Sequence, residues 1–359
     1  MHKPALPSRM HGGPDALGVP RFDFSSNSNA CGPCRMAQQA LQHADASSYP
    51  DPCYTALRAQ LAAHHGVDAA RVVVAGSASE FISRITAWVA RLYWADEERR
   101  GVGLVALPRH AYGDYALAAH AWGLQAAVAS TITMAQQADT LLVWCCEPSS
   151  PQGIAHGEWP HWIVQTPSLP ELPDSMEPVD VAIVRTPPVV LDCAYAPLRL
   201  GGTPSLDAQQ RSRVWQLWSP NKALGLTGVR AAYAIAPLGM QAAVAELDRM
   251  APSWLLGAHG VALLQAWVQP DVQAWLAQSL HTLRSWKTRQ IEMLQSRGWT
   301  CLPSETNFFC ASPGQPMDLK TLRAQGIKLR DASSFGLPGH VRLGVLGLEA
   351  QDALAGALG

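Results

Sequence analysis

The segment "LWSPNKALGLTGVR", residues 217–230, holds the residue types that imine chemistry and phosphate binding require. Lys222 follows a strand-like apolar run and is surrounded by small residues and glycines. Ser219 comes shortly before it and Arg230 shortly after it. A lysine amine can attack a carbonyl group, and a planar guanidinium binds phosphate through two parallel hydrogen bonds. A lysine alone at such a place is often only solvated, so the interpretation depends on these neighbours.

A candidate carboxylate lies upstream in "VVLDCAYAPL". Asp192 ends a β-branched run, and Tyr195 follows it. An aspartate at the end of a strand is often only a turn residue or a helix cap. That alternative is about as good as a functional role while Asp192 is considered alone. The lysine segment downstream favours a functional role for Asp192.

Alternating helical and strand-like signals begin at about residue 52 and indicate an α/β protein. Helices are expected at residues 53–66 and from Ser79 to about Leu92. Short apolar strands are expected at residues 71–76, 101–108, 124–130, 140–146, 189–195, 214–219 and 230–236. Such runs are typical of a largely parallel sheet that is covered on both faces. The Pro-rich residues 166–178 are interpreted as a surface connection.

After about residue 240, long helices replace this alternation, the clearest at residues 270–298. Short strands are expected near residues 306–312, 327–331 and 340–345. We therefore predict an α/β fold with a three-layer αβα large domain, residues 45–245, around a mostly parallel sheet. Residues 1–44 and 246–359 are expected to form a smaller α+β domain with the N-terminal segment.

The composition favours a small-molecule partner. The chain has 359 residues, is 48% hydrophobic and carries a net charge of -1, with its Lys and Arg scattered. A large core is therefore expected, and binding to nucleic acid or to an anionic membrane is not. No stretch approaches the ~20 apolar residues of a membrane span, and the N-terminus lacks the apolar core of a secretory signal. We predict a cytoplasmic protein.

The cysteines suggest neither a disulfide framework nor a metal site. Most of the eight cysteines lie in apolar runs, where cysteine behaves as a small buried hydrophobe. Cys31 and Cys34 flank a Gly-Pro pair, as in the redox centre of thioredoxin-like proteins. Such a centre needs a hydrophobic strand before its first cysteine, whereas polar "SSNSNA" precedes Cys31. A redox role is the less favoured alternative, and no Cys or His pair completes a zinc site.

These segments, in this order, resemble the fold-type I pyridoxal phosphate enzymes, the aspartate aminotransferase superfamily, and its class I/II aminotransferases in particular. The resemblance extends from "HGGPD" to the terminal helix. It implies pyridoxal 5'-phosphate (PLP) as cofactor, with Lys222 as the Schiff-base lysine and Ser219 and Arg230 on the phosphate. Asp192 matches the family's Asp-x-Ala-Tyr motif, whose carboxylate keeps the pyridine nitrogen protonated. Tyr195 is then expected to hydrogen-bond the ring oxygen of the cofactor.

Two further segments match cofactor-binding positions of the family. "VVVAGSASEFI" resembles the strand-to-helix turn whose backbone amides bind phosphate at a helix N-terminus. The implied phosphate ligands are Ser77, Ala78 and Ser79. In "RHAYGDYALAAHAWG", Tyr112 is assigned to stack on the cofactor ring, with Tyr115 or His110 as alternatives and a core tyrosine as the competing interpretation.

Three more segments bear on the substrate and the quaternary structure. "SSYPDP" resembles the family's Tyr-Pro-Asp segment, so Tyr49 is expected to reach the phosphate bound by a partner subunit, which implies a homodimer. "LRDASSFGLPGHVRLGV" resembles the segment whose arginine binds the substrate carboxylate, which implies Arg342. "FDFSSNSNACGPC" resembles the extended segment that passes over the mouth of the active site, which places Asn27 among the substrate-binding candidates.

One motif departs from the family. Where the family has Asn-Pro-x-Asn-Pro-Thr-Gly, this chain reads "EPSSPQG", with Glu147 and Ser150 at the two asparagine positions. The second asparagine normally donates a hydrogen bond to the ring oxygen of the cofactor. Ser150 is shorter and is expected to reach that oxygen only through water. Glu147 is expected to repel an anionic substrate.

The resemblance implies a PLP-dependent aminotransferase that acts on a small L-amino acid or amino phosphate. The C-terminal motif resembles histidinol-phosphate aminotransferase, in which Lys222 would also move a proton from the substrate Cα. The N-terminal motifs resemble threonine-phosphate decarboxylase of cobalamin biosynthesis, so decarboxylation of an amino-acid phosphate is the alternative. A non-catalytic or thiol-redox protein on the same fold is a second alternative, favoured only by the altered "EPSSPQG" motif.

Overall fold

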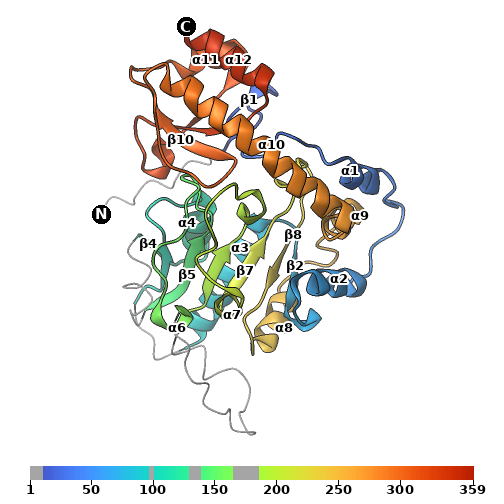
Figure 1. The fold of residues 1–359 in the computed structure, drawn as a ribbon. Coiled ribbons are helices and arrows are strands. Elements are labelled where there is room, and N and C mark those ends of the chain that lie inside the picture. The colour runs from blue at the N-terminus through green and yellow to red at the C-terminus, as the bar shows by residue number, and fades with distance from the viewer. Residues whose placement is uncertain (1–10, 97–100, 129–138, 165–185) are drawn as a thin grey trace.

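A seven-stranded sheet runs through the molecule (Figure 1). It is seen in a computed structural model that describes residues 11–96, 101–128, 139–164 and 186–359. The strand order is β2-β8-β7-β6-β5-β3-β4, with β8 antiparallel to both neighbours and every other pairing parallel. The strands are β2 (Val72–Ala75), β3 (Leu104–Leu107), β4 (Gln125–Val128), β5 (Thr140–Cys146), β6 (Val189–Asp192), β7 (Trp215–Trp218) and β8 (Ala232–Ile235). Each lies within a predicted strand, which confirms the mostly parallel sheet.

Helices cover both faces of this sheet, because alternate residues of each strand point to opposite faces. On β6, Val190 packs with one apolar cluster, whereas Val189 and Leu191 pack with another. One face is covered by α3 (Ala78–Ala95), α4 (Gly113–Ala121) and α8 (Gln241–Arg249). The other face is covered by α2 (Thr55–His65), α6 (His161–Val164) and α7 (Ala208–Arg211), with the short helices η1 (Ala69–Arg71) and η2 (Ala196–Leu198) nearby. The result is the expected three-layer arrangement.

A second, smaller unit combines short strands with helices (Figure 1). Its four-stranded sheet has the order β12-β13-β10-β9, and a two-stranded parallel sheet pairs β1 with β11. The strands are β1 (Phe22–Asp23), β9 (Thr300–Cys301), β10 (Phe308–Ser312), β11 (Ile327–Lys328), β12 (Arg330–Asp331) and β13 (Val341–Gly344). The helices are α1 (Arg35–Gln42), α9 (Ala258–Trp267), α10 (Pro270–Gln295), α11 (Leu319–Ala324), α12 (Leu348–Leu358) and η3 (Ser333–Phe335). The domain boundaries at residues 45 and 245 stay a prediction.

The helix α10 is the long helix that the sequence predicts, and it reaches from α9 to the four-stranded sheet (Figure 1). Pro270 occupies its first turn, where a missing N–H costs nothing. None of the helices in the described parts of the chain is long and apolar enough to cross a membrane. The predicted surface connection at residues 166–178 lies outside the described residues.

Two buried side chains, Trp267 and Tyr233, and the half-buried His65 form a relay between α9, β8 and α2. The indole Nε1 of Trp267 donates to the hydroxyl oxygen of Tyr233 at 3.0 Å, and that oxygen lies 2.8 Å from Nε2 of His65. The buried hydroxyl of Tyr233 needs an acceptor for its own hydrogen, and Nε2 of His65 supplies it. The imidazole proton therefore resides on Nδ1. Burial, with the nearby His64 and Arg211, lowers the pKa of His65 from its ordinary 6.5 to about 3.

This relay predicts acid-sensitive stability. The unfolded chain binds a proton at His65 below its ordinary pKa, while the folded protein excludes it, so stability is lost as the pH falls from 6.5 toward 3. Between about pH 7 and about pH 5 we expect His65 to cost about 2 kcal/mol of unfolding free energy. Urea unfolding at both pH values measures this difference. His65→Gln keeps an acceptor for Tyr233 and should reduce the pH dependence by that amount; equal pH dependence in both proteins would contradict the relay.

Candidate active site

A cavity of about 590 Å³ lies at the carboxyl ends of β5, β6 and β7. In sheets of parallel strands this edge is where ligands usually bind. Residues 11–14 and 25–28 of the N-terminal segment and the strands β12 and β13 complete its wall. The predicted site residues that line it are Asn27, Ser77, Ala78, Ser79, Tyr112, Ser150, Asp192, Tyr195, Ser219, Lys222, Arg230 and Arg342. Tyr49 lines a different hollow of the same chain.

The N-terminus of α3 opens into this cavity. Ser77 caps the helix by accepting the N–H of Glu80 at 3.1 Å, and the Glu80 carboxylate accepts the N–H of Gly76. The cap fixes the start of the helix at Ala78 and leaves the amides of Ala78 and Ser79 to bind an anion. Lys222 lies with its Nζ 3.5 Å from the Ser219 hydroxyl, in the same cavity.

Asp192 is a buried carboxylate that two donors hold in place. Its Oδ1 accepts the backbone N–H of Ala194 at 2.9 Å, and its Oδ2 accepts the hydroxyl of Tyr115 at 2.7 Å. Burial raises the pKa of Asp192, and the Tyr115 hydrogen bond and the charge of Lys222 oppose that shift. The carboxylate is thus fixed in orientation at the end of β6.

Tyr112, Tyr115 and His110 separate into three different environments. Tyr112 lines the cavity, with its hydroxyl 3.4 Å from that of Ser79. Tyr115 is fully buried and stacks on Trp144 with 4.4 Å between ring centroids and 9° between planes. His110 bonds the backbone oxygen of Phe335 and does not line the cavity. The alternative stacking roles for Tyr115 and His110 are therefore wrong, and Tyr112 remains the candidate.

The N-terminal segment reaches the same cavity. Asn27 donates from Nδ2 to the hydroxyl of Tyr195 at 3.2 Å, while its buried Oδ1 has no partner among the described residues. The segment packs so closely that a Cβ on Gly344 of β13 would lie 2.4 Å from the Ser26 carbonyl oxygen. Glycine at that position is what allows the segment to lie against the four-stranded sheet.

Two arginines share one side of the cavity. Arg342 on β13 and Arg330 on β12 are register partners, and both line the cavity. Arg342 donates to Ser150 Oγ at 3.3 Å and to the Ser25 carbonyl oxygen at 3.0 Å, but its buried Nε has no hydrogen-bond partner among the described residues. Burial lowers the pKa of both guanidiniums, and in Arg330 the charge of Arg342 adds to the effect. The sequence analysis missed Arg330, because the pairing of two short strands is not visible in the sequence.

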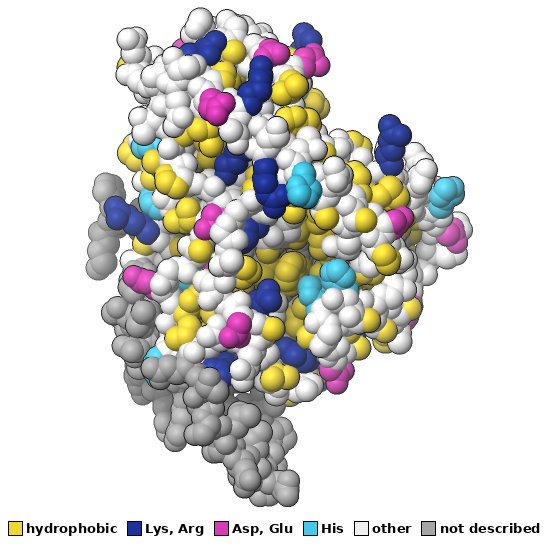
Figure 2. Space-filling view, in the orientation of Figure 1, with side chains coloured by type: hydrophobic (Ala, Val, Ile, Leu, Met, Phe, Trp, Pro, Cys, Tyr) yellow, Lys and Arg dark blue, Asp and Glu magenta, His cyan; other side chains and the backbone are white. Residues whose placement is uncertain are grey.

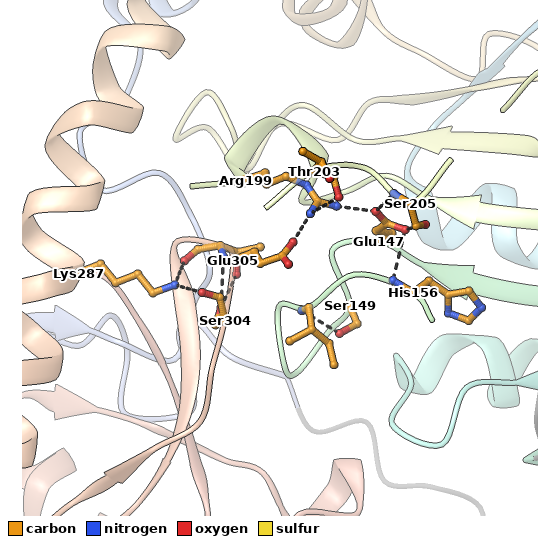
Figure 3. Close-up of polar contacts among 11 residues, drawn as sticks. Glu147, Ser149, His156, Arg199, Thr203, Ser205, Lys287, Ser304 and Glu305 are labelled. Carbon is orange, nitrogen blue, oxygen red and sulfur yellow. Dashed lines mark hydrogen bonds and ion pairs between the residues drawn. The ribbon is translucent and has the colours of Figure 1, made fainter. Parts of the chain in front are cut away.

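Glu147 does not face this cavity, which corrects the expected repulsion of an anionic substrate. Its Oε1 bonds Arg199 at 2.6 Å and the amide of Ser205 at 2.8 Å (Figure 3). Arg199 also pairs with Glu305, which lies beside the Ser304 carbonyl that Lys287 binds (Figure 3). The negative charge of Glu147 is therefore neutralised inside a structural network.

Cys31 and Cys34 lack the features of a reactive pair. Both are free thiols, and burial raises the pKa of each, which disfavours the nucleophilic thiolate. The thiol-redox alternative therefore gains no support. Within the described residues, no group of three or more His, Cys, Asp or Glu side chains is arranged to hold a metal ion.

A sequence model of the family described as "Aminotransferase class I and II" matches residues 179–358, half of the chain. The chain belongs to the class I and II aminotransferase family. The histidinol-phosphate aminotransferase 1 of Thiobacillus denitrificans is 29% identical to this aminotransferase over 362 residues, covering 94% of this chain and 85% of that protein.

Solved structures share the fold of this aminotransferase. Histidinol-phosphate aminotransferase from Sinorhizobium meliloti, in complex with pyridoxal-5'-phosphate, has a TM-score of 0.74 and 20% identity, covering 99% of this chain and 96% of that one. L-threonine-O-3-phosphate decarboxylase from Porphyromonas gingivalis has a TM-score of 0.66 and 19% identity, covering 93% and 97%. The expected PLP fold type I is thereby confirmed.

The cofactor of this aminotransferase is pyridoxal 5'-phosphate, and the cavity fits it. The amides that open α3, the Ser219 hydroxyl and the cation of Arg230 are donors suited to a phosphate dianion. The buried carboxylate of Asp192 suits a protonated ring nitrogen. The unpartnered atoms Asn27 Oδ1 and Arg342 Nε are expected where a bound molecule supplies the partner.

Tyr115→Phe tests how Asp192 is held. Losing a hydrogen bond to a buried carboxylate favours its neutral form, so we expect the affinity of the apoenzyme for PLP to fall about tenfold. Absorbance titration of the apoenzyme with PLP at several pH values measures this, and the loss should grow as the pH falls. Tyr233→Phe, another buried tyrosine, should change stability but not PLP affinity. Unchanged affinity and pH dependence in Tyr115→Phe would refute the role.

Proposed function

We propose that this aminotransferase acts on a small L-amino acid or amino phosphate, similar to histidinol phosphate, and that the predicted site residues act in the roles given below. The pair Arg330 and Arg342 carries the proposal. Both guanidiniums are buried, 6% and 7% exposed, and the carboxylates among the described lining residues are those of Asp114 and Asp192. Two buried cations favour a substrate whose amino carbon lies near a carboxylate or phosphate.

The phosphate of the cofactor would be held by Ser219, Arg230, the amides of Ala78 and Ser79, and the cap residue Ser77. Asp192 would hold a proton on the ring nitrogen, and Tyr112 would stack on the ring. Tyr195, positioned by Asn27, would donate to the ring oxygen. Ser150 stands where the family has an asparagine and receives a hydrogen bond from Arg342, which links that position to the substrate arginine.

Bound PLP supplies an acceptor for the electron pair that remains when a bond to the substrate Cα breaks. Lys222 is first the anchoring amine and then the base that takes the proton from the substrate Cα. Arg342 and Arg330 orient the anionic group of the substrate. Residues 25–28 line the site and would help to exclude water from it. Proton transfer rather than loss of carboxylate is proposed, in keeping with the family of the chain.

The deciding experiment follows the visible spectrum of the PLP-loaded protein during addition of L-glutamate, histidinol phosphate and threonine phosphate. We expect amino donors to convert the yellow form to the colourless pyridoxamine form, with a phosphorylated donor acting at the lower concentration. Release of carbon dioxide from threonine phosphate without pyridoxamine formation would instead identify a decarboxylase.

Two variants separate the roles in this experiment. Lys222→Ala should bind PLP without a borohydride-fixable link and should show no conversion. Arg330→Gln should keep the covalent link but need about tenfold or more phosphorylated donor for half conversion, because a charge-assisted hydrogen bond is lost. Equal donor dependence in Arg330→Gln and the parent would remove the argument for an anionic substrate.

We also propose a homodimer in which Tyr49 reaches the phosphate bound by the partner subunit. Tyr49 is 78% exposed and stacks on Trp254, itself 44% exposed, with 4.3 Å between ring centroids. Beside this pair a hollow is lined by apolar residues of α1 and α9, among them Met36 and Val261. Exposed aromatic and apolar side chains in one patch favour an interface.

We propose that the protein is cytoplasmic. All eight cysteines are free thiols, and disulfide bonds are rare in cytosolic proteins.

Mixed dimers test the contact made by Tyr49. Tyr49→Phe homodimers should bind PLP about tenfold more weakly, because a hydrogen bond to the phosphate is lost. A dimer of one Tyr49→Phe chain and one Lys222→Ala chain contains one site with both Lys222 and the partner's Tyr49. That site should recover the parent affinity for borohydride-fixable PLP. A monomeric protein in ultracentrifugation, or no recovery in the mixed dimer, would refute the proposal.

A further inference from the structure

A second cavity, of about 330 Å³, lies on the other face of β6 and β7. No described residue lines both this cavity and the candidate active site. Its walls come from the end of α2, from α9 and α10, from the residues between η2 and α7, and from β7. Figure 2 shows a hollow near the middle of this face, with hydrophobic side chains inside and His, Lys or Arg side chains at its edge. A cavity of this size is within the range that small molecules occupy.

The apolar part of this cavity suits a flat ring. Trp218 and Trp267 contribute aromatic surface, and the largest aliphatic residues are Leu191, Leu206 and Leu276. Aromatic side chains bury large areas and bind ring systems by offset or edge contacts. The guest is therefore expected to be planar and largely apolar.

Three polar groups of the cavity, from Arg211, His65 and Trp218, are donors for which the described residues supply no acceptor. Arg211 makes no ion pair with any described residue, and its charge is felt at His65. The relay through Tyr233 leaves His65 with a hydrogen on Nδ1, for which the described residues supply no acceptor. The indole Nε1 of Trp218 is buried and unpartnered among the described residues. These donors favour a guest that carries an anionic group.

Among the described residues that line this cavity, the one carboxylate already has hydrogen-bond and charge partners. Glu147 is bound by Arg199, by the amide and hydroxyl of Ser205 and by the amide of His156 (Figure 3). Arg199 is paired with Glu147 and Glu305, so Arg211 is the lining arginine that no described carboxylate pairs. A neutral or cationic guest would leave that guanidinium and two N–H donors unpaired.

We propose that this cavity binds a planar apolar carboxylate, with its ring against Trp218 and Trp267 and its carboxylate on Arg211. The residues that form it are separate from those that hold the cofactor, so the proposal does not depend on the substrate of the active site. It assigns to the chain a second small-molecule site on the back of β6, which carries Asp192, and of β7, which precedes Lys222.

The test compares 1-naphthoate with its neutral analogue 1-naphthamide by isothermal titration calorimetry on the PLP-loaded protein. We expect 1-naphthoate to bind one molecule per chain and 1-naphthamide to bind about tenfold or more weakly, because a charge-assisted hydrogen bond is lost. Arg211→Gln should weaken 1-naphthoate by about the same factor and leave 1-naphthamide unchanged. Arg211→Lys should restore part of the affinity, because it restores the charge.

Two control variants locate the ligand. Arg213→Gln removes a nearby guanidinium that binds the backbone of residues 162 and 163 and lines neither cavity, and it should leave 1-naphthoate binding unchanged. Arg342→Gln should also leave it unchanged. Loss of binding in Arg342→Gln but not in Arg211→Gln would place the ligand in the active site. That result, equal affinity for the two naphthalenes, or no binding of either would overturn the proposal.

Discussion

The buried carboxylate of Asp192 is the constraint on which the rest of the site depends. A carboxylate out of water is costly unless it is hydrogen-bonded and faces a positive charge. The protein supplies the hydrogen bonds from the Ala194 amide and the Tyr115 hydroxyl, and Tyr115 is itself held by stacking on Trp144. Packing in the core on one face of the sheet thus fixes the orientation of the Asp192 carboxylate at the end of β6. A protonated ring nitrogen of the cofactor would complete the compensation.

The opposite charge is organised by different elements. Arg330 and Arg342 belong to the four-stranded sheet, and they meet because β12 and β13 pair in antiparallel register. Their charges repel each other, yet both are buried beside Phe335, with ring centroids 5.0 and 5.4 Å from the guanidinium carbons. Such an arrangement is stable when an anion is shared between the two guanidiniums. Because the carboxylate comes from one sheet and the arginines from another, the candidate site is formed where the two sheets meet.

The fold and much of the site could be predicted from the sequence, because hydrophobic periodicity and short motifs depend only on residues that are neighbours in the chain. The strands end where side chains such as Asp192 and Ser219 appear, and the small residues before α3 indicate a helix N-terminus. Arg330 was missed because only the pairing of two short strands brings it to Arg342. The sequence left Tyr115 open as an alternative to Tyr112, because a tyrosine three residues further along the same helix gives no sign of whether it faces the cavity or the core. Motif matching gives positions, whereas the direction of a side chain is decided by packing.

The direction of the Glu147 side chain could not be predicted from the sequence either. At a position where the family has asparagine, an acid suggests a change in the chemistry of the site. The chain instead directs the carboxylate away from the cofactor cavity, to Arg199 and Ser205, and Arg199 continues the network to Glu305 beside β10. The substitution therefore joins the seven-stranded sheet to the loop that precedes β10. Glu147 also lines the second cavity, where Arg199 and Ser205 bind it, so it does not pair with Arg211. The contacts of this residue therefore lie on the back of the sheet and outside the cofactor cavity.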